Sequence, residues 1–194
     1  MKLSIIVLAS GNSRRFNGNK LLYEIDKKPM YLHTVDKLIE LKKSNKNIDE
    51  IIFVTKYEKI IDNLKDKDIK VIKNNNSEFG ISQSIKLGVS NSSNNTYMFI
   101  VCDQPYIKKE TIDKFINQFI ESKKNLGCVS NNNILLNPTI FTSKYKEKLL
   151  NLSGDKGGKK IILDNLDDLF TFEILDKKEV IDIDFKYQVE DKKR

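Results

Sequence analysis

The sequence is poor in the residues on which several classes of enzyme depend. Its 194 residues include a single histidine, His33, and two cysteines, Cys102 and Cys128. This set is too small for a zinc site, and a Ser-His-Asp or Cys-His mechanism would have to use His33, which lies in a predicted structural helix. Both cysteines lie in apolar segments and form no disulfide framework, so we expect reduced core thiols in a cytoplasmic protein.

Long hydrophobic runs are also absent. No apolar stretch reaches the roughly 20 residues that a membrane-spanning helix needs. The apolar start of the chain is short, and its basic cluster follows the apolar run, which is not typical of a signal peptide. We therefore expect no membrane partner.

Charge of both signs is plentiful, with a formal net charge of +7 and a pI near 9.2. Because lysines are scattered over every segment, the excess indicates a compositional bias, and we predict no nucleic-acid partner. A locally basic cleft would suit a nucleoside triphosphate. With 39% hydrophobic and 31% charged residues, the chain is expected to form a single domain over residues 1–194, with a frayed tail at about 190–194.

Segments that suit buried strands alternate with segments that suit helices. This alternation predicts an α/β fold with a mostly parallel central sheet, and the less regular order after Gly127 predicts that the sheet is mixed. Strands are expected at 3–8, 51–54, 69–72, 97–102, near Cys128, and at 139–141, 170–174 and 180–183; helices are expected from Pro29 to Leu41 and at 60–64, 81–89 and 111–120, with two short ones after 141.

Ligands of open α/β sheets bind beyond the carboxyl ends of the strands, so the loops at those ends are the candidate binding segments. The first is LASGNSRRFNGNK, residues 8–20. Ser10 and Gly11 allow the backbone to approach a triphosphate closely, and cations follow that offset phosphate charge. The spacing is neither a Walker loop nor GxGxxG. These cations are Arg14, Arg15 and Lys20. The alternative to a phosphate-binding loop is an ordinary turn after the strand with solvated cations.

Asp103 follows the buried strand at 97–102, and Pro105 stops that strand from continuing. A carboxylate in this place suits Mg²⁺, which takes one or two carboxylates together with phosphate oxygens. A solvated turn aspartate is the alternative. Asp182 and Asp184 lie two residues apart in a predicted strand, so both would point to one face and form either a second metal ligand or an exposed edge.

Two further loops suit phosphate or base recognition. In residues 74–88, Gly80 with Ser82 and Ser84 would open a helix towards the ligand, and the amides of 74–76 could read a base edge. A polar turn with a helix cap is the alternative. The segment 153–160, SGDKGGKK, has the wrong residues for a Walker loop and follows a helix, so we interpret it as a cradle for a second phosphate.

In this order the segments resemble the molybdenum cofactor cytidylyltransferase family, within the MobA-like NTP transferase superfamily. The resemblance extends over nearly the whole chain, with departures at Ser10, at Asn17, where glycine is usual and Gly18 is displaced by one, and at Phe185. The matching residues are Leu8, Ala9, Gly11, Ser13, Arg15 and Lys20; Asn74, Gly80, Ser82, Ser84 and Gly88; Asp103 and Pro105; Asn137 and Pro138; Gly154, Asp155 and Gly157; and Asp182 with Asp184.

The resemblance implies a three-layer α/β/α, Rossmann-like nucleotidyltransferase fold. It implies that a terminal phosphate of molybdenum-bearing molybdopterin attacks the α-phosphorus of CTP with loss of pyrophosphate, with Mg²⁺ as cofactor and a molybdenum hydroxylase as the recipient. The resemblance implies that Lys20, Arg15 and Asp103 are catalytic and also bind the nucleotide, together with Leu8, Ala9, Ser10, Gly11, Asn74 and Ser82. It implies that the acceptor is bound by Gly154, Asp155, Lys156 and Gly157. The implied metal ligands are Asp103 and Asp184.

Other functions remain open on the sequence. A guanylyltransferase for the same pterin is the nearest alternative, because no single residue dictates cytosine over guanine. A sugar or polyol nucleotidyltransferase shares the first loop. From another class, the chain would be a non-catalytic molybdopterin carrier, which retains pterin without turnover.

Overall fold

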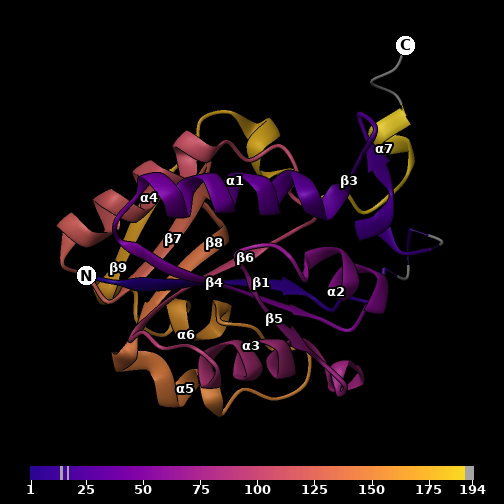
Figure 1. The fold of residues 1–194 in the computed structure, drawn as a ribbon. Coiled ribbons are helices and arrows are strands. Elements are labelled where there is room, and N and C mark those ends of the chain that lie inside the picture. The colour runs from indigo at the N-terminus through magenta and orange to yellow at the C-terminus, as the bar shows by residue number, and fades with distance from the viewer. Residues whose placement is uncertain (14, 17, 191–194) are drawn as a thin grey trace.

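A computed structural model of the chain describes residues 1–13, 15, 16 and 18–190 (Figure 1). Arg14, Asn17 and the end of the predicted tail, 191–194, lie outside the described residues. The main sheet has seven strands in the order β5-β4-β1-β6-β8-β7-β9. These are β1 (Leu3–Ala9), β4 (Ile48–Thr55), β5 (Lys70–Lys73), β6 (Thr96–Val101), β7 (Leu126–Asn131), β8 (Ile134–Thr142) and β9 (Leu169–Glu173). A separate two-stranded sheet pairs β2 (Glu24–Ile25) with β3 (Lys28–Pro29).

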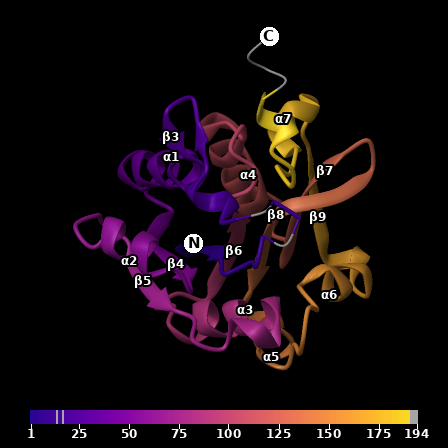
Figure 2. The same cartoon turned by 90° about the vertical axis from the view of Figure 1, so that its right-hand side faces the viewer.

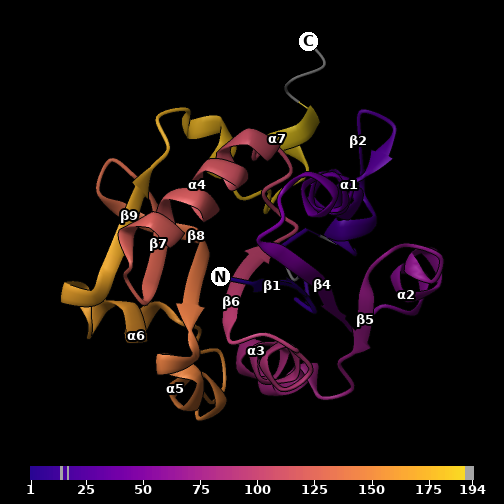
Figure 3. The ribbon, with the colours of Figure 1, turned by 60° about the vertical axis from the view of Figure 1, so that its left-hand side comes forward.

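Six of the seven strands run in one direction. The pairs β1–β4, β1–β6, β4–β5 and β7–β9 are parallel, whereas β8 is antiparallel to both of its neighbours, β6 and β7. Figure 3 shows β8 running against β6. The prediction of a mostly parallel, mixed sheet is confirmed. Because a short hairpin joins β7 to β8, the reversal needs no crossover helix.

Helices cover both faces of the sheet, which gives the predicted three layers (Figure 1). On one face, α1 (Met30–Ser44), α2 (Glu58–Leu64) and α4 (Lys109–Ser122) pack in one hydrophobic cluster with the sheet. On the other face, α3 (Ile81–Ser90), α5 (Lys146–Leu150) and α6 (Lys159–Leu163) pack in a second cluster. A short helix, α7 (Tyr187–Glu190), ends the described chain.

The central strand β1 is buried on both faces, as its continuous apolar run predicts. Ile5 and Val7 belong to the cluster under α1, whereas Ile6 belongs to the cluster over α3. Each of these side chains is 0% exposed, and full burial of such a side chain stabilises the fold by about 1.5–3 kcal/mol. The strand is therefore a rigid base from which the next segment departs.

A polar cluster around Asp168 ties the second half of the chain together. Its carboxylate accepts hydrogen bonds from Lys144 Nζ (2.7 Å), Tyr145 Oη (2.9 Å) and both the backbone N–H and Nδ2 of Asn125 (3.1 Å each). Burial alone would raise the pKa of Asp168, but these hydrogen bonds outweigh it and hold the pKa well below its usual value. The carboxylate thus joins the starts of β7 and β9 to the turn before α5.

The strand predicted at 180–183 does not form. Residues Lys177–Val180 make a 3₁₀ turn, capped by Asp176, whose Oδ1 accepts the N–H of Lys178 at 3.1 Å. Ile183 then donates its N–H to the carbonyl of Asp103 at 2.8 Å, and its side chain is buried in a small cluster with Phe16. The apolar side chains of this segment pack outside the main sheet, so their spacing is not that of a strand.

None of the helices in the described residues combines the length and the hydropathy that crossing a lipid bilayer requires.

Candidate active site

The segment after β1 lies at the carboxyl edge of the parallel strands, the edge seen in Figure 2. Its backbone is held by the end of the neighbouring strand β4. Thr55 Oγ1 donates to the carbonyl of Ala9 at 2.9 Å, and Ser10 Oγ donates to the carbonyl of Val54 at 3.2 Å. Tyr57 Oη also donates to the carbonyl of Gly11. These contacts fix the loop at the point where a phosphate-binding backbone was predicted.

The loop then turns back to bring Lys20 to the same edge. Ser13 has a positive φ of 50°, and its Oγ accepts the N–H of Lys20 at 3.3 Å. Gly18 has a φ of 132°, a conformation that side chains disfavour. Gly18, which lies one position after the place where the family usually has its glycine, therefore supplies the turn. Asn19 caps the following 3₁₀ turn, Lys20–Leu22, by accepting the N–H of Leu21 at 3.0 Å.

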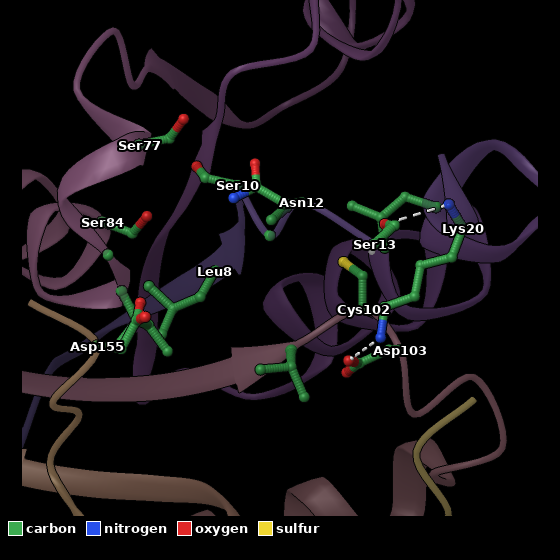
Figure 4. A pocket seen from close by; sticks show the side chains of 16 residues that line it. Leu8, Ser10, Asn12, Ser13, Lys20, Ser77, Ser84, Cys102, Asp103 and Asp155 are labelled. Carbon is green, nitrogen blue, oxygen red and sulfur yellow. Dashed lines mark hydrogen bonds and ion pairs between the residues drawn. The ribbon is translucent and has the colours of Figure 1, made fainter. Parts of the chain in front are cut away.

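Four charged side chains meet at this edge. Lys20 Nζ lies 2.7 Å from Asp103 Oδ2 and 3.0 Å from Asp184 Oδ1. Arg15 Nη1 lies 3.0 Å from Asp184 Oδ2. Three segments far apart in the chain thus contribute two cations and two carboxylates, so the cluster has no net charge. Figure 4 shows the Lys20 side chain extending to Asp103 at one end of the drawn side chains.

The ammonium of Lys20 stays charged in this cluster. Burial by itself lowers the pKa of Lys20, but the charges of Asp103 and Asp184 and their hydrogen bonds outweigh burial and raise the pKa above its ordinary value. The other oxygen of Asp103, Oδ1, is buried and has no hydrogen-bond partner in the described residues. An unpartnered carboxylate oxygen is costly to bury, so this atom is suited to bind a ligand or an ion.

Beside the cluster lies a cleft of about 220 Å³ between the loop after β1 and the start of α3. In Figure 4, Ser10 and Asn12 lie on the side of the loop, whereas Ser77 and Ser84 lie on the side of α3. Seven of the predicted site residues line the cleft: Leu8, Ala9, Ser10, Gly11, Lys20, Asp103 and Asp155.

Gly80 joins the start of α3 to the segment 153–155. Its φ of 89° and ψ of −178° lie in a region that only glycine populates freely. A Cβ atom at Gly80 would lie 2.4 Å from the backbone carbon of Gly154 and 2.6 Å from Oδ1 of Asp155. Ser82 donates its N–H to the carbonyl of Gly154 at 3.2 Å. The far wall of the cleft therefore requires glycine at position 80.

Other predicted site residues lie outside this cleft. Asn74 is 1% exposed, and its amide donates to Ser84 Oγ and accepts the N–H of Asn76, both at 3.0 Å. Ser82 is 0% exposed, with no partner for its Oγ in the described residues. Lys156 and Gly154 line separate surface hollows, and Gly157 lines a neighbouring pocket.

The structure brings Ser84 rather than Ser82 to the cleft. The sequence placed both serines at the start of this helix, but only Ser82 was expected to bind the nucleotide. Helical spacing contains the missing signal, because Ile81 and Ser84 are three residues apart and share one face of α3, whereas Ser82 points elsewhere. Both Ile81 and Ser84 line the cleft. Gln104 is another residue without an assigned role that lies at the site edge, where it donates from Nε2 to Asp182 Oδ1 at 2.9 Å.

Cys102 lines the cleft and Cys128 lines the neighbouring pocket, whereas His33 lines neither. His33 Nε2 hydrogen-bonds the carbonyl of Ile25 at 2.9 Å and does not line the cleft. Cys102 and Cys128 are buried free thiols, as predicted. Burial raises the pKa of Cys102 well above its usual value, and burial raises that of Cys128 to about 11, so neither thiol is a nucleophile at neutral pH.

Metal binding at this edge depends on few protein ligands. In the part of the chain that the structure describes, no group of three or more His, Cys, Asp or Glu side chains is arranged to hold a metal ion. Asp103 and Asp184 share Lys20, and one oxygen of Asp103 is unpartnered. This donor set fits Mg²⁺, which takes one or two carboxylates and completes its shell with water and substrate phosphate.

Comparison with known proteins places the chain among nucleotide-transferring domains. Residues 5–169 match the family described as MobA-like NTP transferase domain. A relative from Thermococcus gammatolerans, named probable molybdenum cofactor guanylyltransferase, is 33% identical over 150 residues, which are 74% of this chain and 71% of the relative. A relative of the same name from Thermococcus sibiricus is 34% identical over 136 residues, which are 64% of this chain and 59% of the relative. The chain thus spans about three fifths of the length of that relative.

Solved structures show the same fold at low sequence identity. A nucleotidyl transferase from Methanothermobacter superposes with a TM-score of 0.80 at 18% identity, over 100% of this chain and 96% of that chain. A protein from Mycobacterium tuberculosis superposes with a TM-score of 0.77 at 16% identity, over 98% and 97%. The predicted Rossmann-like nucleotidyltransferase fold is confirmed.

Proposed function

The chain belongs to the family of MobA-like NTP transferase domains, and from this premise we propose that it is a guanylyltransferase of the molybdenum cofactor. It transfers GMP from GTP to the terminal phosphate of molybdopterin and releases pyrophosphate. The observation that carries the proposal is the cluster of Lys20, Arg15, Asp103 and Asp184 beside a loop whose backbone faces the cleft.

The choice of GTP corrects the expectation of CTP. The sequence resemblance was to a cytidylyltransferase branch, with the guanylyl reaction as the alternative. Relatives at 33–34% identity from two Thermococcus species are named probable molybdenum cofactor guanylyltransferases, and these names support the alternative. They do not name a recipient of the product, so the molybdenum hydroxylase stays a prediction, as does the cytoplasmic location.

In the proposed reaction an oxygen of the acceptor phosphate attacks the α-phosphorus of GTP. The bond between the α-phosphorus and the oxygen that bridges to the β-phosphorus breaks, and that oxygen leaves with pyrophosphate. Since the acceptor phosphate is already a nucleophile, no covalent enzyme intermediate is needed. Positioning and charge stabilisation by the protein then supply the catalysis.

Lys20 and Arg15 bind the triphosphate in this proposal. Two of the three N–H donors of Lys20 are directed to Asp103 and Asp184 in the described residues, and we assign the third to a phosphate oxygen. Arg15 is more exposed, and its planar guanidinium can bind two phosphate oxygens at once. The backbone of Ser10 and Gly11 contacts the same phosphates.

Asp103 and Asp184 would hold Mg²⁺, with Oδ1 of Asp103 as the first ligand because it is buried without a partner. A bound Mg²⁺ would offset charge that builds up on the phosphates. The protein itself brings the segments of the two carboxylates together, because Ile183, the residue before Asp184, donates its N–H to the backbone carbonyl of Asp103.

The test is pyrophosphate release with Mg²⁺, a molybdopterin acceptor and each nucleoside triphosphate in turn. We expect release that depends on the acceptor and on GTP, and that stops when EDTA removes the metal. Release with CTP alone would return the protein to the cytidylyl branch. If the folded protein retains pterin but releases no pyrophosphate with any triphosphate, the result would favour a non-catalytic molybdopterin carrier over the enzyme.

A further inference from the structure

A second pocket, of about 250 Å³, adjoins the cleft. Leu8, Ile81 and Val101 line both cavities, so these side chains form a wall that the two cavities share. Asp103 lines the first cavity, and the next residue, Gln104, lines the second. Two ligands bound side by side would therefore meet at this residue pair, which follows β6.

The walls of the second pocket are mostly apolar and come from both halves of the sheet, and their polar side chains are Gln104, Asn137, Thr139, Lys159 and Asp182. An apolar pocket with few polar groups is typical of a site for a flat organic ring, which the polar groups then orient. The apolar lining consists of Leu8, Ile81, Ile85, Phe99, Val101, Leu135, Leu136 and Ile162.

Gln104 supplies an unpartnered polar atom in this lining. The residue is 1% exposed, and its Oε1 is buried without a hydrogen-bond partner in the described residues. Its Nε2 donates to Oδ1 of Asp182 at 2.9 Å. The amide cannot be turned over without cost, because its oxygen would then face a carboxylate oxygen. Asp182 thus fixes the orientation of the Gln104 amide, with Nε2 directed to Asp182 and Oε1 available to a hydrogen-bond donor.

Burying an acceptor without a partner is costly, and a ligand that donates a hydrogen bond to it recovers this free energy. An amide oxygen accepts and cannot donate, so the matching ligand carries an N–H or O–H group. On a flat nitrogen heterocycle this donor is an N–H. A flat ring with N–H groups describes a pterin, the ring system of the acceptor in the proposed function.

We propose that the second pocket binds the pterin ring of the acceptor, and that Oε1 of Gln104, oriented by Asp182, accepts a hydrogen bond from a ring N–H. This inference rests on the proposed function for the identity of the ring. Gln104 is a specificity residue that distinguishes rings with an N–H edge from rings without one. The acceptor phosphate then extends across the shared wall towards Asp103.

The first experiment uses the unaltered protein and two fluorescent probes, pterin and 1,3-dimethyllumazine, which share the two-ring pteridine system. The second probe has no ring N–H. We expect pterin to bind about ten- to a hundredfold more tightly, the range that one unsatisfied buried acceptor supports. Saturating GTP should leave the pterin affinity in place, because the two ligands occupy different cavities. Equal affinities for both probes, or displacement of pterin by GTP, would overturn the proposal.

The second experiment compares Gln104→Met, close in size but without the amide, with the matched control Gln118→Met on an exposed turn of α4. In Gln104→Met we expect the preference for pterin over 1,3-dimethyllumazine to disappear, while calorimetric GTP affinity stays as in the unaltered protein. In the control both should be unchanged. A Gln104→Met protein that folds and keeps the preference would refute the role of Gln104. Since these are binding measurements, absence of pyrophosphate release would count against the proposed function alone.

Discussion

Gly80→Ala should uncouple the far wall of the cleft from the start of α3. The new Cβ would lie 2.4 Å from the carbon and 2.5 Å from the oxygen of Gly154, and 2.6 Å from Oδ1 of Asp155. Two of these atoms belong to the backbone, so a side-chain rotation does not remove the overlap. In addition, a φ of 89° with a ψ of −178° is unfavourable for alanine.

The two costs can be estimated separately. Backbone strain in this region is about 1–3 kcal/mol. Overpacking adds about 1–3 kcal/mol. We therefore expect the free energy of unfolding to fall by about 2–6 kcal/mol, a large part of the about 5–15 kcal/mol that is usual for a domain. If the segment 153–155 moves to relieve the overlap, the loss is at the lower end and the affinity for nucleotide falls instead, because Asp155 lines the cleft.

Urea unfolding followed by circular dichroism measures the first effect, and calorimetric titration with GTP measures the second. Gly157→Ala is the matched control, because a Cβ there would approach only Ile81 Cγ2, at 4.0 Å, and its backbone needs no positive φ. The control should unfold within about 1 kcal/mol of the unaltered protein. If Gly80→Ala matched the control in both stability and GTP affinity, the reasoning about the close approach would be wrong.

Three further outcomes are expected. Asp103→Asn should lower turnover about a hundredfold in a folded protein, whereas Asp68→Asn on the exposed surface should not; normal turnover by Asp103→Asn would remove the residue from the site. Asp168→Asn should lower the free energy of unfolding by about 1.5–3 kcal/mol at pH 7. Because the pKa of Asp168 is held low in the folded chain, this difference should be full above about pH 4 and shrink as the pH falls further; a difference independent of pH would contradict the assignment. A thiol reagent at pH 7 should label Cys102 and Cys128 only on unfolding, and rapid labelling of native protein would show that they are accessible.

The order of strands and helices could be predicted because each element has a local pattern. The run from Leu3 to Leu8 is apolar at every side chain but Ser4, which requires a strand buried on both faces, and the structure confirms it. The segment at 180–183 has a similar local pattern but no strand. Its outcome depends on the hydrogen bond from Ile183 to Asp103, and a residue 80 positions away leaves no trace in local spacing.

Part of the site followed from position alone. Lys20 and Asp103 each follow a strand of a parallel sheet, and carboxyl ends of parallel strands lie at one edge, so their proximity could be expected from the sequence. The spacing of Asp182 and Asp184 made them candidates for a second metal ligand, but it did not show that Asp184 lies beside Asp103, because this segment reaches the site through loops. Asn74 was named for a base contact, yet its amide is satisfied by Ser84 and Asn76, which depends on how the loop folds on α3.

The sequence by itself thus determined the α/β architecture, the family and the position of the loop after β1 at the edge of the sheet, because periodicity, motifs and strand ends are local properties. Tertiary structure decided which polar atoms remain without partners. Asp103 Oδ1 and Gln104 Oε1 are adjacent in the chain, yet one lies beside the cleft and the other beside the second pocket. Whether a buried polar atom is satisfied depends on every segment packed around it, and only the folded chain brings those segments together.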